Sequence, residues 1–238
     1  MEYTKSKKYD VPLIREKIMG PNPIKLEEEL LRDNLIPANA VVMDLGSGQG
    51  VTSVFLAQEY GFRVYAADLW SDPAENQRFF DEMGVPRDRL IPVKADAMAL
   101  PFEKEFFDAV ISVDSYNYFG RDPKYLDACL LPFIKPGGYL YLVFPGMTRD
   151  CHDDLPAELL LSWTPEQLDY MHDLAYWRDM FHQSEGAEIL SLRETEGNEE
   201  LWRDWLACDN EYAVNDRKSM EAGGGKYLNF IAAVLQKK

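Results

Sequence analysis

The sequence predicts a doubly wound α/β fold: a mostly parallel sheet of seven strands, with helices on both faces and an antiparallel last strand. Apolar runs of strand length alternate along the chain with amphipathic segments of helical length, which is the pattern of a parallel sheet with crossover helices. The runs lack an apolar/polar alternation, as strands buried on both faces do. A glycine-rich turn after the first run opens a helix, as the ligand loops of such sheets do.

The elements follow in order, and Gly or Pro marks the end of several helices. The last apolar run arrives without an ordinary crossover, so we expect it to insert antiparallel at or near an edge of the sheet. Strands are expected over residues 40–46, 63–69, 89–96, 106–115, 139–146, 188–195 and 227–236. Helices are expected over residues 25–36, 51–61, 74–84, 123–134 and 199–207, and from Thr164 toward Gly186.

We expect a single domain, residues 1–238, because the chain is long enough for one sizeable core. Residues 1–37 form an N-terminal arm and helix, and residues 38–146 form the half that binds a cofactor. After the fifth strand the alternation breaks for longer than an ordinary loop. The arm and the insertions at residues 147–185 and 197–225 are therefore expected to form a lid on the substrate side.

The charge and the cysteine content exclude several classes of function. The formal net charge is −16, and such a surface repels phosphate backbones and anionic membranes, so we expect no nucleic acid and no membrane as partner. Three widely spaced cysteines fit a reducing cytoplasm. We expect a cytoplasmic protein, a monomer or homodimer. A neutral or cationic small substrate suits the acidic field, although a need for solubility explains the charge equally well.

The stretch VVMDLGSGQG, residues 41–50, is the most informative motif. Its glycines allow a tight turn and let a ligand lie against backbone N–H groups, but glycines also mark ordinary strand–helix turns. Asp44, before the first glycine, would repel a pyrophosphate, and the glycine spacing departs from the nicotinamide fingerprint. A NAD-type oxidoreductase is therefore the second reading. Asp44 favours a ligand that carries positive charge, such as a sulfonium with an α-amino group.

Two further acids end the next two strands. Asp68 is placed to accept hydrogen bonds from a ribose diol. Asp96 is placed to accept from an exocyclic adenine amine. Each has an alternative interpretation as a turn former or helix N-cap, but three acids at three successive strand ends together favour a nucleoside-containing ligand.

These segments, with AADLW, VKADAMALPFEKEFFDAVISVDSYNYF and FIKPGGYLYLVFPG, resemble the class I S-adenosylmethionine-dependent methyltransferases. They are similar to the small-molecule branch that includes the ubiquinone/menaquinone-biosynthesis type. The resemblance covers roughly residues 38–146. It implies a Rossmann-like fold, S-adenosyl-L-methionine as cofactor, and methyl transfer to O, N or C of a small molecule. The implied cofactor residues are Asp44, Gly46, Ser47 and Gly48 in the loop, Asp68 at the ribose, Leu69, Asp96 and Ala97 at the adenine, and Asp114 and Ser115 at the methionine.

The methyl acceptor is expected past the fourth strand, where VDSYNYFG borders the cofactor cleft. Tyr116 and Tyr118 are the preferred contacts, with core packing as the alternative for both. His152 in RDCHDD is a candidate general base, with a solvated acidic loop as the alternative. No second His lies at ligand spacing from His152, so we expect no metal. A non-catalytic cofactor-binding or regulatory protein on the same scaffold is the third reading.

Overall fold

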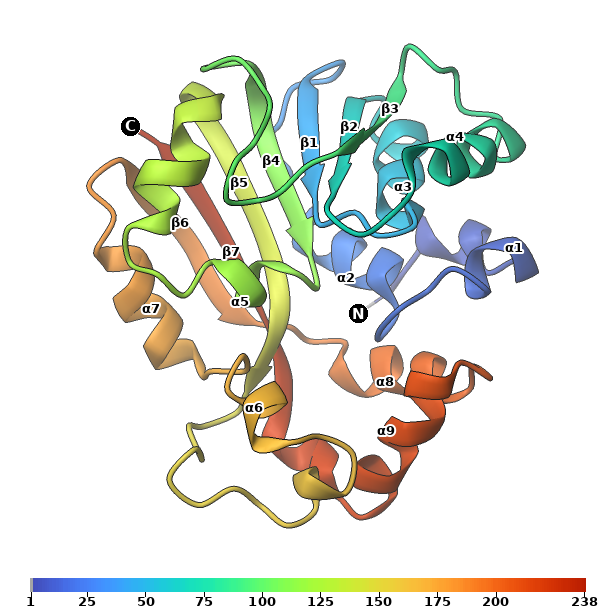
Figure 1. Cartoon of the computed structure of the whole chain (residues 1–238), viewed down its shortest axis with the longest axis vertical. Helices are drawn as coiled ribbons and strands as arrows, with labels where there is room; N and C mark the ends of the chain where they lie inside the picture. Colours follow the sequence, from blue (N-terminus) through green and yellow to red (C-terminus); the bar gives the residue numbers. More distant parts are fainter. Residues whose placement is uncertain (1) are drawn as a thin grey trace.

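The computed structural model describes residues 2–238 and confirms the predicted α/β sheet. Its seven strands lie in the order β3-β2-β1-β4-β5-β7-β6, with helices on either side (Figure 1). The strands are β1 (Val41–Leu45), β2 (Arg63–Asp68), β3 (Leu90–Lys94), β4 (Phe107–Val113), β5 (Ile134–Met147), β6 (Ala187–Glu194) and β7 (Leu228–Lys237).

The strand pairing confirms that the last strand is antiparallel. β1 to β5 pair in parallel, whereas β7 pairs antiparallel with both β5 and β6. β7 is therefore inserted next to the edge of the sheet. The chain order reverses at β1, which has β2 on one side and β4 on the other. Ligands of open α/β sheets bind beyond the carboxyl ends of the strands at this position.

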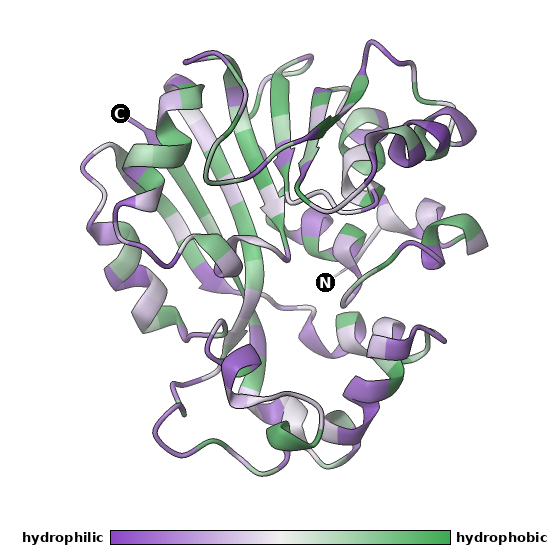
Figure 2. Cartoon of the chain, viewed as in Figure 1, coloured by the Kyte–Doolittle hydropathy of each residue, from purple (hydrophilic) through white to green (hydrophobic). Residues whose placement is uncertain are grey.

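Hydrophobic residues predominate in the strands (Figure 2). Buried apolar side chains form two cores, as the near-continuous apolar strands predict. One core packs the sheet against α2 (Pro23–Leu30), α3 (Val51–Glu59) and α4 (Pro73–Glu82). The other core packs it against α7 (Leu174–His182) and a π-helical turn at Leu126–Leu130. The two cores bury the strands and thereby position the loops that follow them.

Two helices differ from the expected ones. Residues 123–134 contain only the π-helical turn and a 3-10 turn at Leu131–Phe133, because Pro132 has no N–H for a continuing helix. The helix expected from Thr164 is two helices, α6 (Pro165–Leu168) and α7. Asp173 separates them: its side chain accepts from the Tyr176 N–H at 2.9 Å and caps α7.

Opposite the carboxyl ends of the strands, a helical cap faces the sheet (Figure 1). The cap contains α8 (Asn198–Leu206), which was predicted, and α9 (Glu211–Glu221), which was not. The N-terminal arm, with a 3-10 turn at Ser6–Tyr9 and α1 (Pro12–Arg15), lies beside it. Among residues 2–238, none of the helices combines the length and apolar content needed to cross a bilayer.

Candidate functional site

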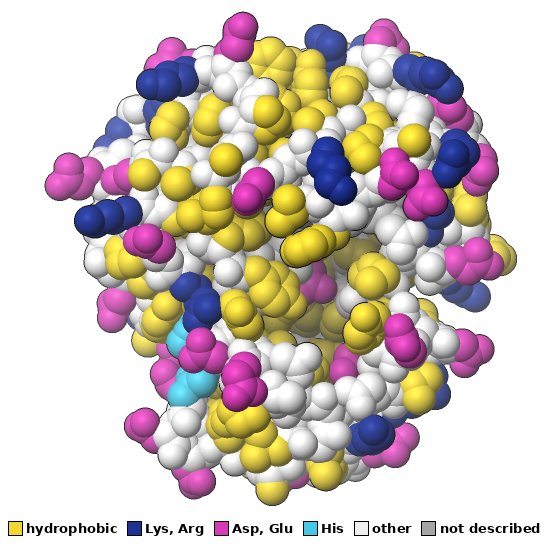
Figure 3. All heavy atoms as spheres, viewed as in Figure 1, with side chains coloured by type: hydrophobic (Ala, Val, Ile, Leu, Met, Phe, Trp, Pro, Cys, Tyr) yellow, Lys and Arg dark blue, Asp and Glu magenta, His cyan; other side chains and the backbone are white. Residues whose placement is uncertain are grey.

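A cavity of about 580 Å³ opens over the carboxyl ends of β1, β2, β3 and β4, within the roughly 300–1,000 Å³ typical of small-molecule sites. Figure 3 shows the hollow that this face of the molecule carries between the strand ends and the cap, bordered by apolar side chains. Lys17, Met19, Gly20 and Pro23 of the arm also line the cavity. The arm thus covers the loops that follow the strands.

The three glycines of the β1–α3 loop have different reasons to lack a side chain. A Cβ on Gly46 would lie 2.2 Å from Ser115 Oγ, and one on Gly50 would lie 2.3 Å from a carbon of the Phe80 ring. Those two glycines make room for other parts of the protein. Gly48 has a φ of +52° and nothing within 4 Å of a Cβ position. Its backbone borders open cavity, so Gly48 is where a ligand can lie against the loop.

Ser47 and Lys17 offer polar groups to this space. Ser47 lines the cavity, and its Oγ is buried without a hydrogen-bond partner. Such an atom costs free energy unless a ligand or water satisfies it. Lys17 is the only basic residue among the described residues that line the cavity, and it suits the carboxylate of an amino-acid moiety.

Asp44 lies behind the loop and not against the cavity. Its Oδ2 accepts hydrogen bonds from Thr52 Oγ1 at 2.7 Å and Ser53 Oγ at 2.6 Å, and the residue is absent from the cavity wall. Burial raises the pKa of Asp44 to about 6, against the two hydrogen bonds that lower it. In this structure Asp44 ties the first turn of α3 to β1 through Oδ2, while its Oδ1 is buried without a hydrogen-bond partner. Only Thr52 of this group lines the cavity, and the contact of Asp44 with the methionine part stays a prediction.

Thr52→Val should lower the free energy of unfolding of the cofactor-free protein by about 1–3 kcal/mol above about pH 8, because ionised Asp44 loses one of its two donors. Asp44 is protonated below its pKa of about 6, so the loss should shrink at about pH 5. Urea unfolding at both pH values measures the difference, and Thr52→Ser keeps the hydroxyl as the control. A loss of equal size at both pH values would contradict this role of Asp44.

Asp68 lines the cavity at the end of β2 and organises two loops. Its Oδ2 accepts from the Gly48 N–H at 3.0 Å, and its Oδ1 accepts from the N–H groups of Trp70 at 2.8 Å and Ser71 at 2.7 Å. A carboxylate has about four lone-pair sites. In this conformation one site on Oδ2 stays available to a ribose hydroxyl, beside the exposed face of the Gly48 backbone.

The residues expected at the adenine lie on the next part of the cavity wall. Asp96 and Ala97 line it after β3, and Leu69 lines it after β2. Asp96 Oδ1 accepts from the Met98 N–H at 2.9 Å, which fixes the carboxylate and leaves its Oδ2 able to accept from a ligand. Tyr125 donates to the Ala97 carbonyl at 3.0 Å and supports this turn from below.

Asp114 and Ser115, at the end of β4, complete the cavity wall. Asp114 has a φ of +56°, which Asp tolerates better than most residues, and its Oδ2 would lie 2.2 Å from a Cβ on Gly20 of the arm. Burial, and then the charge of Asp216 on α9, raise the pKa of Asp114 to about 7. Ser115 donates to the Leu45 carbonyl at 2.9 Å. The cavity wall therefore includes an acid of the sheet, Asp114, whose pKa is raised in part by an acid of the cap, Asp216.

The three residues predicted to be catalytic lie in different surroundings. Tyr118, on α5 (Tyr116–Phe119), lines the cavity, and its ring lies 5.2 Å from that of Tyr170. Loss of solvent and the charge of Asp114 raise its pKa to about 12, so Tyr118 stays protonated and able to donate. Tyr116 is only 1% exposed, packs among core aromatic side chains and does not line the cavity. This position fits the alternative in which Tyr116 is a core residue. His152 lies outside the cavity wall.

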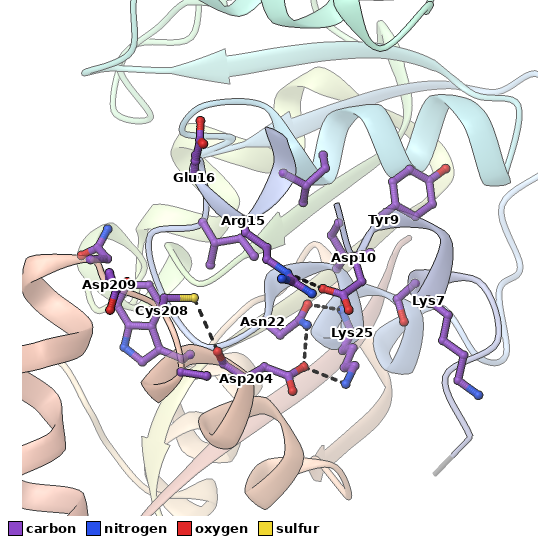
Figure 4. Close-up of a pocket in the computed structure, with 17 residues that line it drawn as sticks. Lys7, Tyr9, Asp10, Arg15, Glu16, Asn22, Lys25, Asp204, Cys208 and Asp209 are labelled. Atoms are coloured by element: carbon purple, nitrogen blue, oxygen red, sulfur yellow. Dashed lines mark hydrogen bonds and ion pairs between the residues drawn. The ribbon is translucent and has the colours of Figure 1, made fainter. Parts of the chain in front are cut away.

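A second cavity, of about 740 Å³, separates the arm from α8 (Figure 4). Asn22 Nδ2 and Lys25 Nζ both bond to Asp204 Oδ2, at 2.8 and 2.7 Å, across one end of it. Arg15 pairs with Asp10 at 2.6 Å within the arm. These contacts attach the arm to the cap, so the covering of the first cavity depends on both.

Several residues of the site carry no motif in the sequence. Lys17 and Gly20 reach the cavity because the arm crosses it, and Asp216 acts from a helix that the sequence did not predict. His172 lies beside His152, with ring centroids 4.7 Å apart, although twenty positions separate them. Of these residues, only Thr52 could have been found from the sequence, because it places a hydroxyl in the first helical turn after a strand that ends in an acid.

A family model described as a methyltransferase domain matches residues 43–142. The match runs from β1 into β5 and contains all of the strand ends that wall the cavity on the sheet side. This part of the chain is therefore similar to the class I S-adenosylmethionine-dependent methyltransferases. The family uses S-adenosyl-L-methionine as its cofactor, which fits a cavity with an unpartnered Ser47 hydroxyl, an open backbone at Gly48 and a carboxylate at Asp68.

The relatives that this chain matches differ in what their names say they methylate. A sarcosine/dimethylglycine N-methyltransferase of Aphanothece halophytica is 24% identical over 60% of this chain and 50% of its own length. A fibrillarin-like rRNA/tRNA 2'-O-methyltransferase of Methanoculleus marisnigri is 28% identical over 64% of this chain and 74% of its own length. A solved phosphoethanolamine N-methyltransferase of Haemonchus contortus has a TM-score of 0.73 at 18% identity, covering 99% of this chain and 57% of that one. The chain thus spans about half the length of the first of these relatives, and the acceptor is not fixed by likeness.

Proposed function

We propose that this protein transfers the methyl group of S-adenosylmethionine to the nitrogen of a small amine. The observation that supports an amine as the acceptor is the position of Asp114 on the cavity wall. A second acid, Asp216 of the cap, acts on Asp114 electrostatically. An ammonium group in this space relieves the repulsion between the two carboxyl groups, whereas an anionic acceptor adds to it. The net charge of −16 acts in the same direction over longer range.

When bound, the cofactor would supply the methyl group of its sulfonium to the acceptor nitrogen, and S-adenosylhomocysteine would be the second product. The protein's tasks are alignment and exclusion of water. Gly48, Ser47 and Asp68 hold the cofactor, and Lys17 faces its carboxylate. Asp114 attracts the acceptor as an ammonium and takes up the proton that the nitrogen loses, since a pKa of about 7 suits a general base. Tyr118 orients the acceptor by donating a hydrogen bond.

The relatives support the amine in part. The name of the Aphanothece protein gives sarcosine and dimethylglycine, both small amines. The Methanoculleus protein acts, by its name, on RNA, but an RNA acceptor would have to approach a chain of net charge −16. We therefore favour the amine over a nucleic acid.

Calorimetry tests the cofactor, and product release tests the acceptor. We expect binding of S-adenosylmethionine and none of NAD; the reverse would favour the NAD-type oxidoreductase over the methyltransferase. S-adenosylhomocysteine release is then measured against panels of small amines, phenols, thiols and tRNA. Release with amines supports the proposal, release with another class alone overturns the amine, and tight cofactor binding without release from any panel favours the non-catalytic reading.

A further inference from the structure

Outside the cofactor cavity, three side chains of metal-ligating type converge in the insertion between β5 and α7. Asp150 and His152 lie in the loop after β5, and His172 lies between α6 and α7. One potential ligand atom from each lies within 4.8 Å of the other two. Histidine side chains and acidic side chains adjoin to the lower left of the central hollow in Figure 3. The cluster joins two loops that the sequence places twenty residues apart.

The hydrogen bonds of His152 leave its Nδ1 facing a carboxylate oxygen, an arrangement that a proton or a metal ion stabilises. Its Nε2 lies 3.1 Å from the Leu168 carbonyl oxygen, which only accepts, so Nε2 carries the hydrogen. In a neutral imidazole Nδ1 then has a lone pair, and it faces Asp150 Oδ1 at 2.7 Å. Two lone pairs at that distance repel unless a proton or a metal ion lies with them. A histidine that binds a metal through one nitrogen and donates from the other to a backbone carbonyl is the usual arrangement around a bound metal.

His172 provides an independent sign of a missing ligand. Its Nδ1 is buried and has no hydrogen-bond partner. The ring is held by stacking on Tyr176, with centroids 3.6 Å apart, and its backbone carbonyl is bound to the Met147 N–H at 3.1 Å. A fixed ring with an unsatisfied buried nitrogen costs free energy that a metal bond would remove.

We propose that Asp150, His152 and His172 bind a divalent transition-metal ion of the zinc type, with water in the remaining coordination position. Two imidazoles and one carboxylate are a donor set that suits Zn²⁺ and its neighbours better than Mg²⁺ or Ca²⁺, which prefer oxygen ligands alone. With metal–ligand bonds of about 2.0–2.1 Å, tetrahedral ligands lie about 3.4 Å apart. The pair of His152 Nδ1 and Asp150 Oδ1, at 2.7 Å, therefore has to open by about 0.7 Å, and the pairs with His172, which lie within 4.8 Å, have to close by at most about 1.4 Å. Side-chain rotation of exposed Asp150 and small loop shifts supply both changes.

The ion would fasten the loop after β5 to the turn between α6 and α7 and would take no part in methyl transfer. None of the three ligands is on the wall of the cofactor cavity, and the loop of His172 is bonded to the end of β5 through Met147. Arg121 lies near enough to act on His172 electrostatically, which opposes a cation there, while Asp150 and Asp169 act in its favour. Binding should raise the melting temperature of the protein and leave the cofactor affinity unchanged.

The test uses the full chain, first dialysed against a chelator and then titrated with Zn²⁺ by calorimetry and thermal unfolding. We expect one Zn²⁺ per chain and a rise in melting temperature that the chelator reverses. His172→Gln and Asp150→Asn should each weaken Zn²⁺ binding about tenfold or more. His182→Gln, which changes an exposed histidine of α7, is the matched control and should bind as the unaltered protein does.

Co²⁺ identifies the ligands. Four-coordinate Co²⁺ bound by two histidines and a carboxylate gives visible d–d absorption without a thiolate charge-transfer band, and Cys151→Ser should leave it unchanged. Absence of stoichiometric Zn²⁺ binding in the folded protein would overturn the proposal. So would equal binding by His172→Gln with a native circular dichroism spectrum, or a thiolate band that Cys151→Ser removes.

Discussion

Replacing Asp68 by Ala should weaken the binding of S-adenosylmethionine by about 10- to 150-fold, the equivalent of roughly 1.5–3 kcal/mol for lost hydrogen bonds to a charged group. The carboxylate has two roles in the structure. It accepts from the backbone N–H groups of Gly48, Trp70 and Ser71, and it keeps one lone-pair site directed to the space where a ribose hydroxyl is expected. Alanine removes both roles, so the loop loses its position together with its partner.

Calorimetry with Asp68→Ala, Asp68→Asn and Asp88→Ala separates these roles. Asp68→Asn keeps the shape and one acceptor oxygen, so its loss should be smaller than that of Asp68→Ala. Asp88→Ala removes an exposed carboxylate outside the cavity wall and should leave the affinity unchanged. Unchanged affinity in Asp68→Ala would show that the ribose lies elsewhere.

The fold was readable from the sequence because the composition of its strands reflects their surroundings. A run such as Ala109 to Val113 is apolar on both faces except at Ser112, since helices cover both, and that pattern indicates a parallel sheet. The antiparallel insertion of β7 followed from the missing crossover. The break between α6 and α7 was not readable, because it depends on Asp173 capping a new helix within an otherwise helix-compatible stretch.

The sequence predicted the site residues that follow the strand ends, but it could not predict those that only tertiary contacts bring to the site. Asp68, Asp96 and Asp114 line the cavity as expected, because carboxyl ends of parallel strands meet at one edge. Asp44 occupies a similar position in the sequence, but it does not line the cavity, and its Oδ2 accepts from Thr52 and Ser53 of the helix that follows. A strand-end acid that precedes two hydroxyl residues in the first helical turn can therefore serve the helix as well.

The second large effect is expected at Asp114. Asp114→Asn should lower turnover with an amine acceptor on the order of 10²-fold, which is typical for loss of a general base, with much less effect on cofactor affinity. Asparagine has the same shape and also tolerates the φ of +56°, so the cavity wall stays in place. Steady-state kinetics at saturating cofactor measure turnover. A loss of cofactor affinity with unchanged turnover would assign Asp114 to the cofactor alone.

The pH dependence distinguishes a base from a merely structural carboxyl. The pKa of about 7 of Asp114 comes from burial first and from the charge of Asp216 second, and Tyr118 and Lys17 are titratable groups that line the same cavity. A base acts only when deprotonated, so turnover of the unaltered protein should rise with pH up to about 7 and then level off. The cations of cofactor and acceptor favour the carboxylate, which moves this rise to lower pH. Asp114→Asn should have no such rise.

Stability should move in the opposite direction to activity at Asp114. The folded protein holds the proton of Asp114 up to a pKa of about 7, whereas the unfolded chain releases it near the ordinary carboxyl pKa of about 4. Between these values the folded state binds more protons, so the free energy of unfolding falls as pH rises. Asp114→Asn removes that fall, and the cofactor-free variant should be more stable than the unaltered protein above about pH 7 while it turns over more slowly. Urea unfolding across this range measures it, and a variant that is both slower and less stable at high pH would mean that Asp114 holds the fold and is not kept for chemistry.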